Sequence, residues 1–148
     1  MTADTDPATM LAYGRKVLAA QPFSTLVGAE LAALSPDGAE IRLPITEKLL
    51  QQYGFVHGGV LAYLADNALT YAGAMTLDGP PLTAEMKINY LRPASGEMLI
   101  ARAKALSAGK RLSVVRCEIF ALEDGTERLC AAAQGTIAAG RPFEKQSA

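Results

Sequence analysis

The chain has 148 residues, half of them hydrophobic, and a formal net charge of −1 at pH 7. This length and apolar content suit a single domain with a sizeable core. The nearly balanced charge argues against nucleic acid as a partner, because binding to a phosphate backbone requires a basic face.

The predicted elements begin with an amphipathic helix over residues 7–20, where apolar side chains recur at helical spacing. Pro22 is expected to end this helix, which belongs to an N-terminal helical extension of residues 1–21. Two short strands, 26–34 and 39–44, then flank a Ser-Pro-Asp-Gly segment that favours a tight reversal. A connecting loop or short helical turn leads on from the second strand.

The most informative segment is an apolar run from Val56 to Met75 that contains a single carboxylate, Asp66. A helix that is apolar around most of its circumference has to be wrapped by the rest of the fold. An ionised carboxylate buried without partners costs several kcal/mol, so Asp66 is neutralised, paired or retained for chemistry. The alternative is an Asp that turns to solvent or hydrogen-bonds a neighbouring strand.

The residues just before this run, His57-Gly58-Gly59, place two glycines at the predicted helix start. The first N–H groups of a helix have no intrahelical partner, and with the helix dipole they favour an anion or a developing oxyanion. The plainer alternative is that the glycines simply turn the chain into the helix. His57 is the chain's single histidine, so it cannot belong to a multi-histidine metal site, and we expect no metal.

The spacing of Gly59 and Asp66 adds a constraint on how they could act together. At about 1.5 Å per residue, seven helical steps separate them by roughly 10 Å along the axis. One helix therefore cannot bring both to a single reacting carbon. Two antiparallel copies of the helix about a two-fold axis could, so catalysis at these residues implies a dimer with two shared sites.

The second half of the chain predicts an antiparallel sheet. Four strands follow a break at Gly79-Pro80-Pro81, over residues 83–91, 98–107, 112–122 and 127–138. In the first of these strands Ala84, Met86, Ile88 and Tyr90 are expected to face the core. The domain core then covers about residues 22–138, followed by a tail, 139–148.

The last two strands are predicted to form a hairpin around Asp124-Gly125, a strong turn signal. Cys117 and Cys130 would lie on these strands as buried free thiols in a reducing compartment. Small residues, Ala131 to Ala133 and Gly135, would let the central helix or a partner sheet pack closely against the last strand.

The start of the chain bears on location. Residues 1–7 are polar and acidic, without the basic stretch and apolar run of a secretory signal. No segment reaches the roughly 18 uninterrupted apolar residues of a membrane span. We therefore expect a cytoplasmic protein that does not insert into a membrane.

Together these motifs resemble one known family. His57-Gly58-Gly59, then Asp66 after six further residues, then the segment Thr-Ala-Glu-Met-Lys-Ile-Asn-Tyr-Leu-Arg-Pro from Thr83, are similar to PaaI-type acyl-CoA thioesterases of the hotdog-fold superfamily. The similarity runs from about Pro22 to Ile137. It implies an α+β fold, a single hotdog domain in which a curved antiparallel sheet wraps a long central helix. It also implies a site formed between subunits.

The same resemblance implies roles for individual residues. Asp66 would be the general base or the nucleophile, and the Gly59 N–H would polarise the thioester carbonyl. Thr83 would lie near Asp66 as a hydrogen-bonding partner, and His57 would have a supporting role. Many family members place Asn six residues before the histidine, where this chain has Gln51. Its amide offers the same donor and acceptor on a longer stem.

Substrate-binding residues are expected at two further places. The turn containing Gly109, Lys110 and Arg111 joins a flexible glycine to two cations, which suits contact with the phosphates of CoA. The alternative is an ordinary charged loop. Gly58 and Asn67 would contact substrate beside the catalytic residues.

The expected activity is hydrolysis of an acyl- or aryl-CoA thioester to CoA and a carboxylic acid. CoA is then part of the substrate, so no cofactor is expected, and the homodimer would assemble further into a tetramer. The acyl group would lie in an apolar pocket with Leu61, Tyr63 and Tyr71 as candidate walls, and the favoured alternative is that each of these side chains is plain core. Two rivals remain: a non-catalytic protein that binds acyl-CoA or acyl carrier, and a hotdog hydratase or dehydratase.

Overall fold

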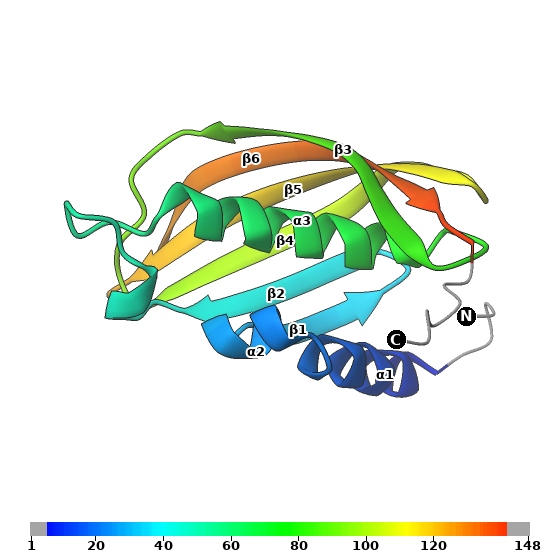
Figure 1. Ribbon diagram of the computed structural model, residues 1–148, viewed down its shortest axis with the longest axis horizontal. Coiled ribbons are helices and arrows are strands. Elements are labelled where there is room, and N and C mark those ends of the chain that lie inside the picture. Colours follow the sequence, from blue (N-terminus) through cyan, green and yellow to red (C-terminus); the bar gives the residue numbers. More distant parts are fainter. Residues whose placement is uncertain (1–5, 142–148) are drawn as a thin grey trace, which may run out of the picture.

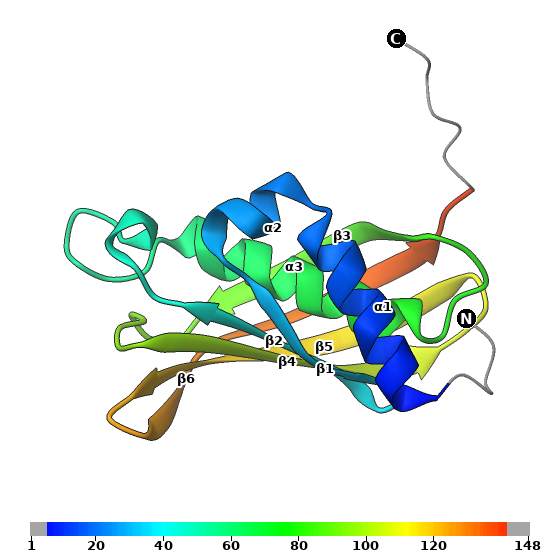
Figure 2. The same ribbon diagram turned by 90° about the horizontal axis from the view of Figure 1, so that it is seen from below.

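Residues 6–141 are described by a computed structural model, shown in Figure 1. The helices are α1 (Pro7–Ala19), α2 (Pro22–Val27) and α3 (Gly58–Ala74), with a short 3-10 helix, η1 (Glu47–Leu49). The strands are β1 (Glu30–Ser35), β2 (Gly38–Pro44), β3 (Pro81–Tyr90), β4 (Met98–Ala108), β5 (Leu112–Glu123) and β6 (Thr126–Ala139). They form one antiparallel sheet in the order β1-β2-β4-β5-β6-β3. The sheet curves around α3, which confirms the predicted α+β hotdog architecture (Figures 1 and 2).

The N-terminal segment contains the main error in the predicted elements. The predicted first helix is present as α1, and its N-cap Asp6 accepts a hydrogen bond from the Thr9 N–H at 3.1 Å. However, residues 22–27 form the helix α2 rather than the start of a strand. Pro22 occupies the first turn of α2, where a missing N–H costs nothing, and Gly28 ends it with a left-handed φ of 81°. The strand β1 therefore begins at Glu30.

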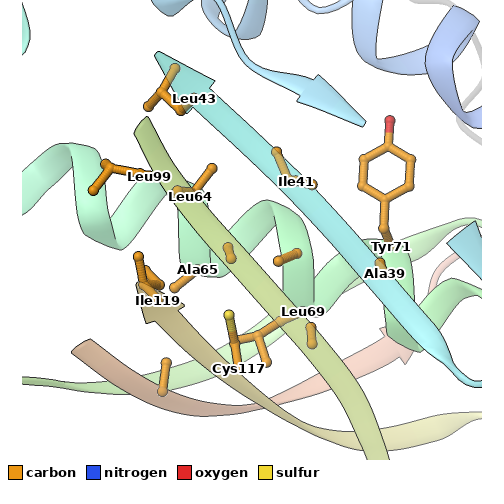
Figure 3. Packing of buried hydrophobic residues seen from close by; sticks show 14 of the residues in the cluster. Ala39, Ile41, Leu43, Leu64, Ala65, Leu69, Tyr71, Leu99, Cys117 and Ile119 are labelled. Carbon is orange, nitrogen blue, oxygen red and sulfur yellow. The ribbon is translucent and has the colours of Figure 1, made fainter. Parts of the chain in front are cut away.

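Helix α3 packs one side against the sheet and leaves the other side partly open. Leu64 and Leu69 are fully buried, and Figure 3 shows them among Ile41, Leu99 and Ile119 of the sheet. The other side of α3 carries side chains that are half-buried, among them Asp66, Asn67 and Thr70. The expectation of a helix wrapped on all sides is therefore wrong for a single chain, because the curved sheet reaches around one side only.

Small residues bring α3 close to β6, as predicted. A methyl group on Gly73 of α3 would lie 2.8 Å from Cβ of Ile137 on β6. A methyl group on Gly135 of β6 would lie 3.2 Å from Cδ1 of Leu69. Both distances are shorter than ordinary van der Waals contact, so the helix sits at this distance because neither position has a side chain.

The two edges of the sheet differ in what packs against them. At the β1 edge, α1 packs on the strand and Arg15 donates to the backbone carbonyl of Leu31 at 2.9 Å. At the other edge, β3 pairs with β6 alone. Of the four residues expected to face the core from β3, Met86 and Ile88 are half-buried, whereas Ala84 and Tyr90 are exposed. An edge position and a register shift between Thr83 and Glu85 explain this difference.

The predicted hairpin and thiols are present. Asp124 and Gly125 form the turn between β5 and β6 with φ values of 48° and 74°. Cys117 and Cys130 are free and buried. Burial raises the pKa of the Cys117 thiol to about 12 and that of Cys130 to about 11. Both side chains are therefore unreactive thiols in the folded protein. Separately, no helix within residues 6–141 has the length and apolar character needed to cross a bilayer.

Candidate active site

The first half of the candidate site is a cluster of oxygen atoms around Asp66. Thr83 of β3 donates from Oγ1 to Oδ1 of Asp66 at 2.6 Å. The Thr83 hydroxyl also lies 3.0 Å from Oγ1 of Thr70, one helical turn beyond Asp66 on α3. No lysine or arginine in residues 6–141 forms an ion pair with Asp66. The carboxylate is therefore oriented by hydroxyl groups, borders solvent, and keeps lone pairs for accepting a proton.

The second half is the start of α3. His57 is its N-cap, and Nδ1 of the imidazole accepts the Gly59 N–H at 2.9 Å. The backbone carbonyl of Gly58 accepts the Tyr90 hydroxyl at 3.2 Å. The N–H expected to contact a thioester carbonyl is thus occupied by the protein's own histidine. That histidine is exposed, so its ring has room to turn away from the helix end.

Gln51 lies beside this helix start, and part of its amide is already used. Its side-chain oxygen accepts the Tyr53 N–H, and its backbone N–H donates to the Phe55 carbonyl at 2.8 Å. These bonds close the turn that leads into α3. Gln51 and Gly58 line the same cavity of about 360 Å³. Its amide nitrogen is consequently the group available to a ligand there.

Within one chain the two halves do not meet. Gly59 and Asp66 lie on the same side of one continuous helix, two turns apart. Their separation along the axis is roughly 10 Å. The predicted residues therefore form two clusters: a helix-start cluster (Gln51, His57, Gly58, Gly59) and a carboxylate cluster (Asp66, Thr70, Thr83).

The remaining predicted substrate-binding residues lie away from the helix-start cluster. Asn67 adjoins the carboxylate cluster, and its amide nitrogen donates to the Tyr63 carbonyl at 3.4 Å. Residues 109–111 form the exposed turn between β4 and β5. This turn lies beyond the C-terminal end of α3, where the Asp78 N–H donates to the Lys110 carbonyl at 2.9 Å. It touches neither cluster of the same chain.

Sequence reasoning missed two polar contacts, and it left the role of Tyr63 open between pocket wall and plain core. Thr70 was detectable, since it lies four residues after Asp66 and so on the same side of the helix. The Tyr90 contact with Gly58 joins residues far apart in the chain, and no local sequence pattern predicts it. The Tyr63 hydroxyl donates to Ser24 at 2.6 Å. That side chain therefore anchors α2 on α3, and it lines no cavity seen beside the carboxylate cluster in residues 6–141.

No three histidine, cysteine, aspartate or glutamate side chains in the described part of the chain gather as metal ligands would. The described residues instead offer an oriented carboxylate on one part of a long helix, and a helix start whose Gly59 N–H is bonded to His57.

A curved antiparallel sheet around a long helix is the hotdog fold, and this chain presents a carboxylate on the open side of that helix. The chain belongs to the thioesterase superfamily, because the model of that family matches residues 53–128. The matched segment contains His57, Gly59, Asp66 and Thr83, while Gln51 precedes it.

Three similar proteins place the chain more narrowly. It is 30% identical to the 1,4-dihydroxy-2-naphthoyl-CoA hydrolase of Listeria monocytogenes, over 76% of this chain and 90% of the relative. A thioesterase family protein from Silicibacter pomeroyi is 33% identical, with a TM-score of 0.83 over 87% of this chain and 96% of that one. A variant of the phenylacetic acid degradation protein PaaI from Thermus thermophilus is 27% identical, with a TM-score of 0.71 over 81% and 100% of the two chains. The membership of the thioesterase superfamily predicted from the motifs is confirmed, and a PaaI protein is among the similar structures.

Proposed function

We propose that the protein hydrolyses acyl-CoA thioesters to CoA and a carboxylic acid, at a site shared between two subunits. The observation that carries this proposal is the 2.6 Å contact between Thr83 and Asp66 on the open side of α3. The name of the Listeria relative, a naphthoyl-CoA hydrolase, supports a CoA thioester as substrate.

The carboxylate cluster would perform the attack. Asp66 removes a proton from a water molecule that attacks the thioester carbon, or it attacks that carbon itself to form an anhydride that water then opens. In the first route Asp66 passes the proton from water to the sulfur as the C–S bond breaks, so CoA leaves as the thiol. In the second route CoA leaves as the thiolate and takes a proton from solvent, and water attacks the acyl carbon of the anhydride, which regenerates the Asp66 carboxylate. In both routes the two oxygens of the acid come from the carbonyl and from water. The Thr83 hydroxyl fixes the carboxylate so that one oxygen remains free for this step.

The helix-start cluster would stabilise the charge that develops on the carbonyl oxygen. Backbone N–H groups at the positive end of α3 are suited to an oxyanion. The Gly59 N–H becomes available when the imidazole of His57 swings off it, so His57 acts as a cap that the substrate displaces. The amide nitrogen of Gln51 is close enough to this helix start to bind the carbonyl or the water.

A second subunit would join the two clusters. The open edge of the sheet, β3, carries Thr83 and borders Asp66. Pairing of β3 with its copy about a two-fold axis would continue the sheet and set two α3 helices antiparallel. The helix start of one subunit then faces Asp66 of the other. Exposed apolar side chains at both ends of β3, Leu82 and Leu91, favour a covered edge.

The turn at residues 109–111 would bind the CoA phosphates. Lys110 and Arg111 are exposed, and no ion pair occupies either cation in residues 6–141. The turn lies past the C-terminal end of α3. In the antiparallel dimer, that end of α3 would lie at the same end of the helix pair as the start of the partner's α3. Gly58 and Asn67 line the two cavities beside the clusters and would contact the rest of the substrate.

The test is release of free thiol from a panel of acetyl-, medium-chain, long-chain and aryl-CoA thioesters. We expect wild type to turn over at least one of them and Asp66→Asn to lose about 10²–10⁴-fold in kcat/KM, the usual contribution of a general base. Asp124→Asn is the matched control, because it makes the same change in an exposed turn that tolerates either residue. No thiol release by wild type, or full activity of Asp66→Asn, would contradict the proposal.

The two rivals give different results in the same panel. A binding protein retains acyl-CoA, detected by calorimetry, without releasing thiol. A hydratase bleaches the absorbance of an enoyl-CoA while the thioester stays intact.

The oligomeric state and the mixing of inactive variants test whether the site is shared between subunits. Sedimentation velocity at assay concentration should show a dimer or tetramer. Mixing inactive Asp66→Asn with a second inactive variant, Gly59→Pro, should restore part of the activity, since a mixed dimer contains one intact pair of clusters. A fully active monomer would exclude the shared site.

A further inference from the structure

A cavity of about 420 Å³ lies between α1 and the C-terminal half of α3. Its volume falls in the range of small-molecule pockets, about 300–1,000 Å³. Helix α1 contributes Tyr13 and Val17 to its lining, and α3 contributes Thr70, Tyr71 and Ala74. The lining is mainly apolar, with two tyrosine rings, so the cavity suits a hydrocarbon or aromatic group.

This cavity adjoins the carboxylate cluster. Thr70 belongs to both, since it lines the cavity and contacts the Thr83 hydroxyl at 3.0 Å. Thr83 in turn holds the carboxylate of Asp66 at 2.6 Å. A thioester carbon placed next to Asp66 would therefore lie at the mouth of the cavity, with its acyl chain able to point toward α1.

Contacts with the sheet and with α3 hold α1 at a fixed position. Gly14 packs so closely on the sheet that a methyl group there would lie 2.6 Å from Cδ2 of Leu31. The Tyr71 hydroxyl donates to the Gly14 carbonyl at 3.1 Å, which leaves the tyrosine ring as wall. The Arg15 side chain donates to the backbone carbonyl of the same Leu31 at 2.9 Å. These bonds fix how far Tyr13 and Val17 stand from α3.

We propose that α1 closes the far end of the acyl pocket, and that Tyr13 and Val17 determine how large an acyl group the enzyme accepts. This inference rests on the proposed thioesterase activity. It assigns a specificity function to a helix that precedes the segment matched by the family model, residues 53–128. In this arrangement an acetyl group occupies only the end of the cavity next to Thr70, whereas a benzoyl or octanoyl group extends toward α1.

The test uses Val17→Phe, which fills the cavity from the α1 side, and Tyr13→Ala, which removes part of the wall. The matched control is Leu26→Phe, the same kind of enlargement at an exposed position of α2 that lines no part of the cavity. We expect Val17→Phe to lower kcat/KM for benzoyl- and octanoyl-CoA by about 10-fold or more, the scale on which an apolar pocket discriminates size. The value for acetyl-CoA should stay near wild type. Tyr13→Ala opens the far end of the pocket, so it should raise kcat/KM for lauroyl-CoA relative to octanoyl-CoA and spare acetyl-CoA.

A binding measurement tests this inference independently of catalysis. In an Asp66→Asn background, calorimetry compares the Kd of benzoyl-CoA with that of CoA alone, and Val17→Phe should abolish the difference. An equal loss for acetyl-, benzoyl- and octanoyl-CoA, or an unchanged benzoyl-to-acetyl ratio in Val17→Phe, would overturn the inference while the thioesterase activity stands. A wild type that releases no thiol would overturn the proposed function, and the binding comparison would still decide whether the cavity holds the acyl group.

Discussion

The two sides of α3 differ in what they contact and in what they contribute. The side that faces the sheet carries Leu64 and Leu69, which are fully buried in the core (Figure 3). The other side carries Asp66 and Thr70, which are half-buried and bonded to Thr83 of an edge strand. The same helix thus supplies the centre of the core and the candidate catalytic group.

This difference teaches that fold and chemistry are separable along one helix. Apolar burial on the sheet side stabilises the fold regardless of what the open side carries. The open side can hold a carboxylate at low cost, because water and hydroxyl groups solvate it. Substitutions on the two sides should therefore affect different quantities, stability on one and turnover on the other.

The largest loss of stability is expected from Leu64→Ala, on the side of α3 that faces the sheet. Removing a fully buried leucine side chain should lower the free energy of unfolding by about 2–5 kcal/mol, because both burial and packing are lost. Chemical denaturation measures this, and kcat/KM of the folded fraction should stay close to wild type. Asp66→Asn should show the opposite pattern, with unfolding changed by less than about 0.5 kcal/mol. Similar losses of stability in both variants would contradict the separation.

A smaller effect is expected where α3 touches β6. Gly73→Ala places a methyl group 2.8 Å from Cβ of Ile137, so the helix must shift. Overpacking of this kind costs about 1–3 kcal/mol, partly offset by the better helix propensity of alanine, about 1 kcal/mol. Thermal unfolding measures the loss.

The second variant for this contact is the double change Gly73→Ala with Ile137→Ala. The smaller side chain on β6 makes room for the new methyl group, so the double variant should be more stable than the sum of the two single effects predicts. Strict additivity would mean that the close approach of helix and strand does not limit stability.

On the open side, Thr83→Val should reduce kcat/KM by about 10-fold, because the Asp66 carboxylate loses the hydroxyl that orients it. Stability should hardly change, since valine suits an exposed edge strand. Thr136→Val is the matched control: it removes a comparable hydroxyl bond, 2.7 Å from Thr136 to Glu85, on the neighbouring strand. Equal activity losses in the two variants would remove Thr83 from the site.

The smallest expected effect is a change in the pH dependence of stability. It concerns neither side of α3 but the outer face of the sheet, where Arg102 forms ion pairs with Glu40 and Glu127. Burial raises the pKa of Glu40, but the hydrogen bonds from Arg102 and Arg42 outweigh it, and the pKa lies below its usual value. The hydrogen bond from Arg102 likewise lowers the pKa of Glu127.

The sign of the pH effect follows from these lowered values. The ion pairs stabilise the fold above the unfolded glutamate pKa of about 4.3, and this contribution is lost as the pH falls through the lower folded pKa values. Surface pairs of this kind contribute about 1 kcal/mol or less each. Unfolding at pH 6 and pH 3 should therefore differ more in wild type than in Arg102→Gln, and identical differences would contradict the assignment.

Local sequence signals predicted most of the elements, and their failures have local causes. The alternation of apolar residues found the strands, and Asp124-Gly125 found the hairpin. Pro22 was ambiguous, because proline can follow one helix and also begin the next. The exposure of Ala84 and Tyr90 was not predictable, because alternation shows that a strand has two faces and says nothing about whether the strand lies at an edge.

By itself, the sequence determined the elements, the family and the distance between Gly59 and Asp66 along one helix, because these depend on neighbouring residues and on a fixed helical rise. Only the tertiary structure decided which groups surround that pair. It placed Thr70 beside the Thr83–Asp66 contact that the family resemblance implied, put the open β3 edge beside them, seated His57 on the Gly59 N–H and set α1 across the cavity from α3. Most of these contacts join segments far apart in the chain, and all of them depend on how the side chains and strands pack, which local patterns do not encode.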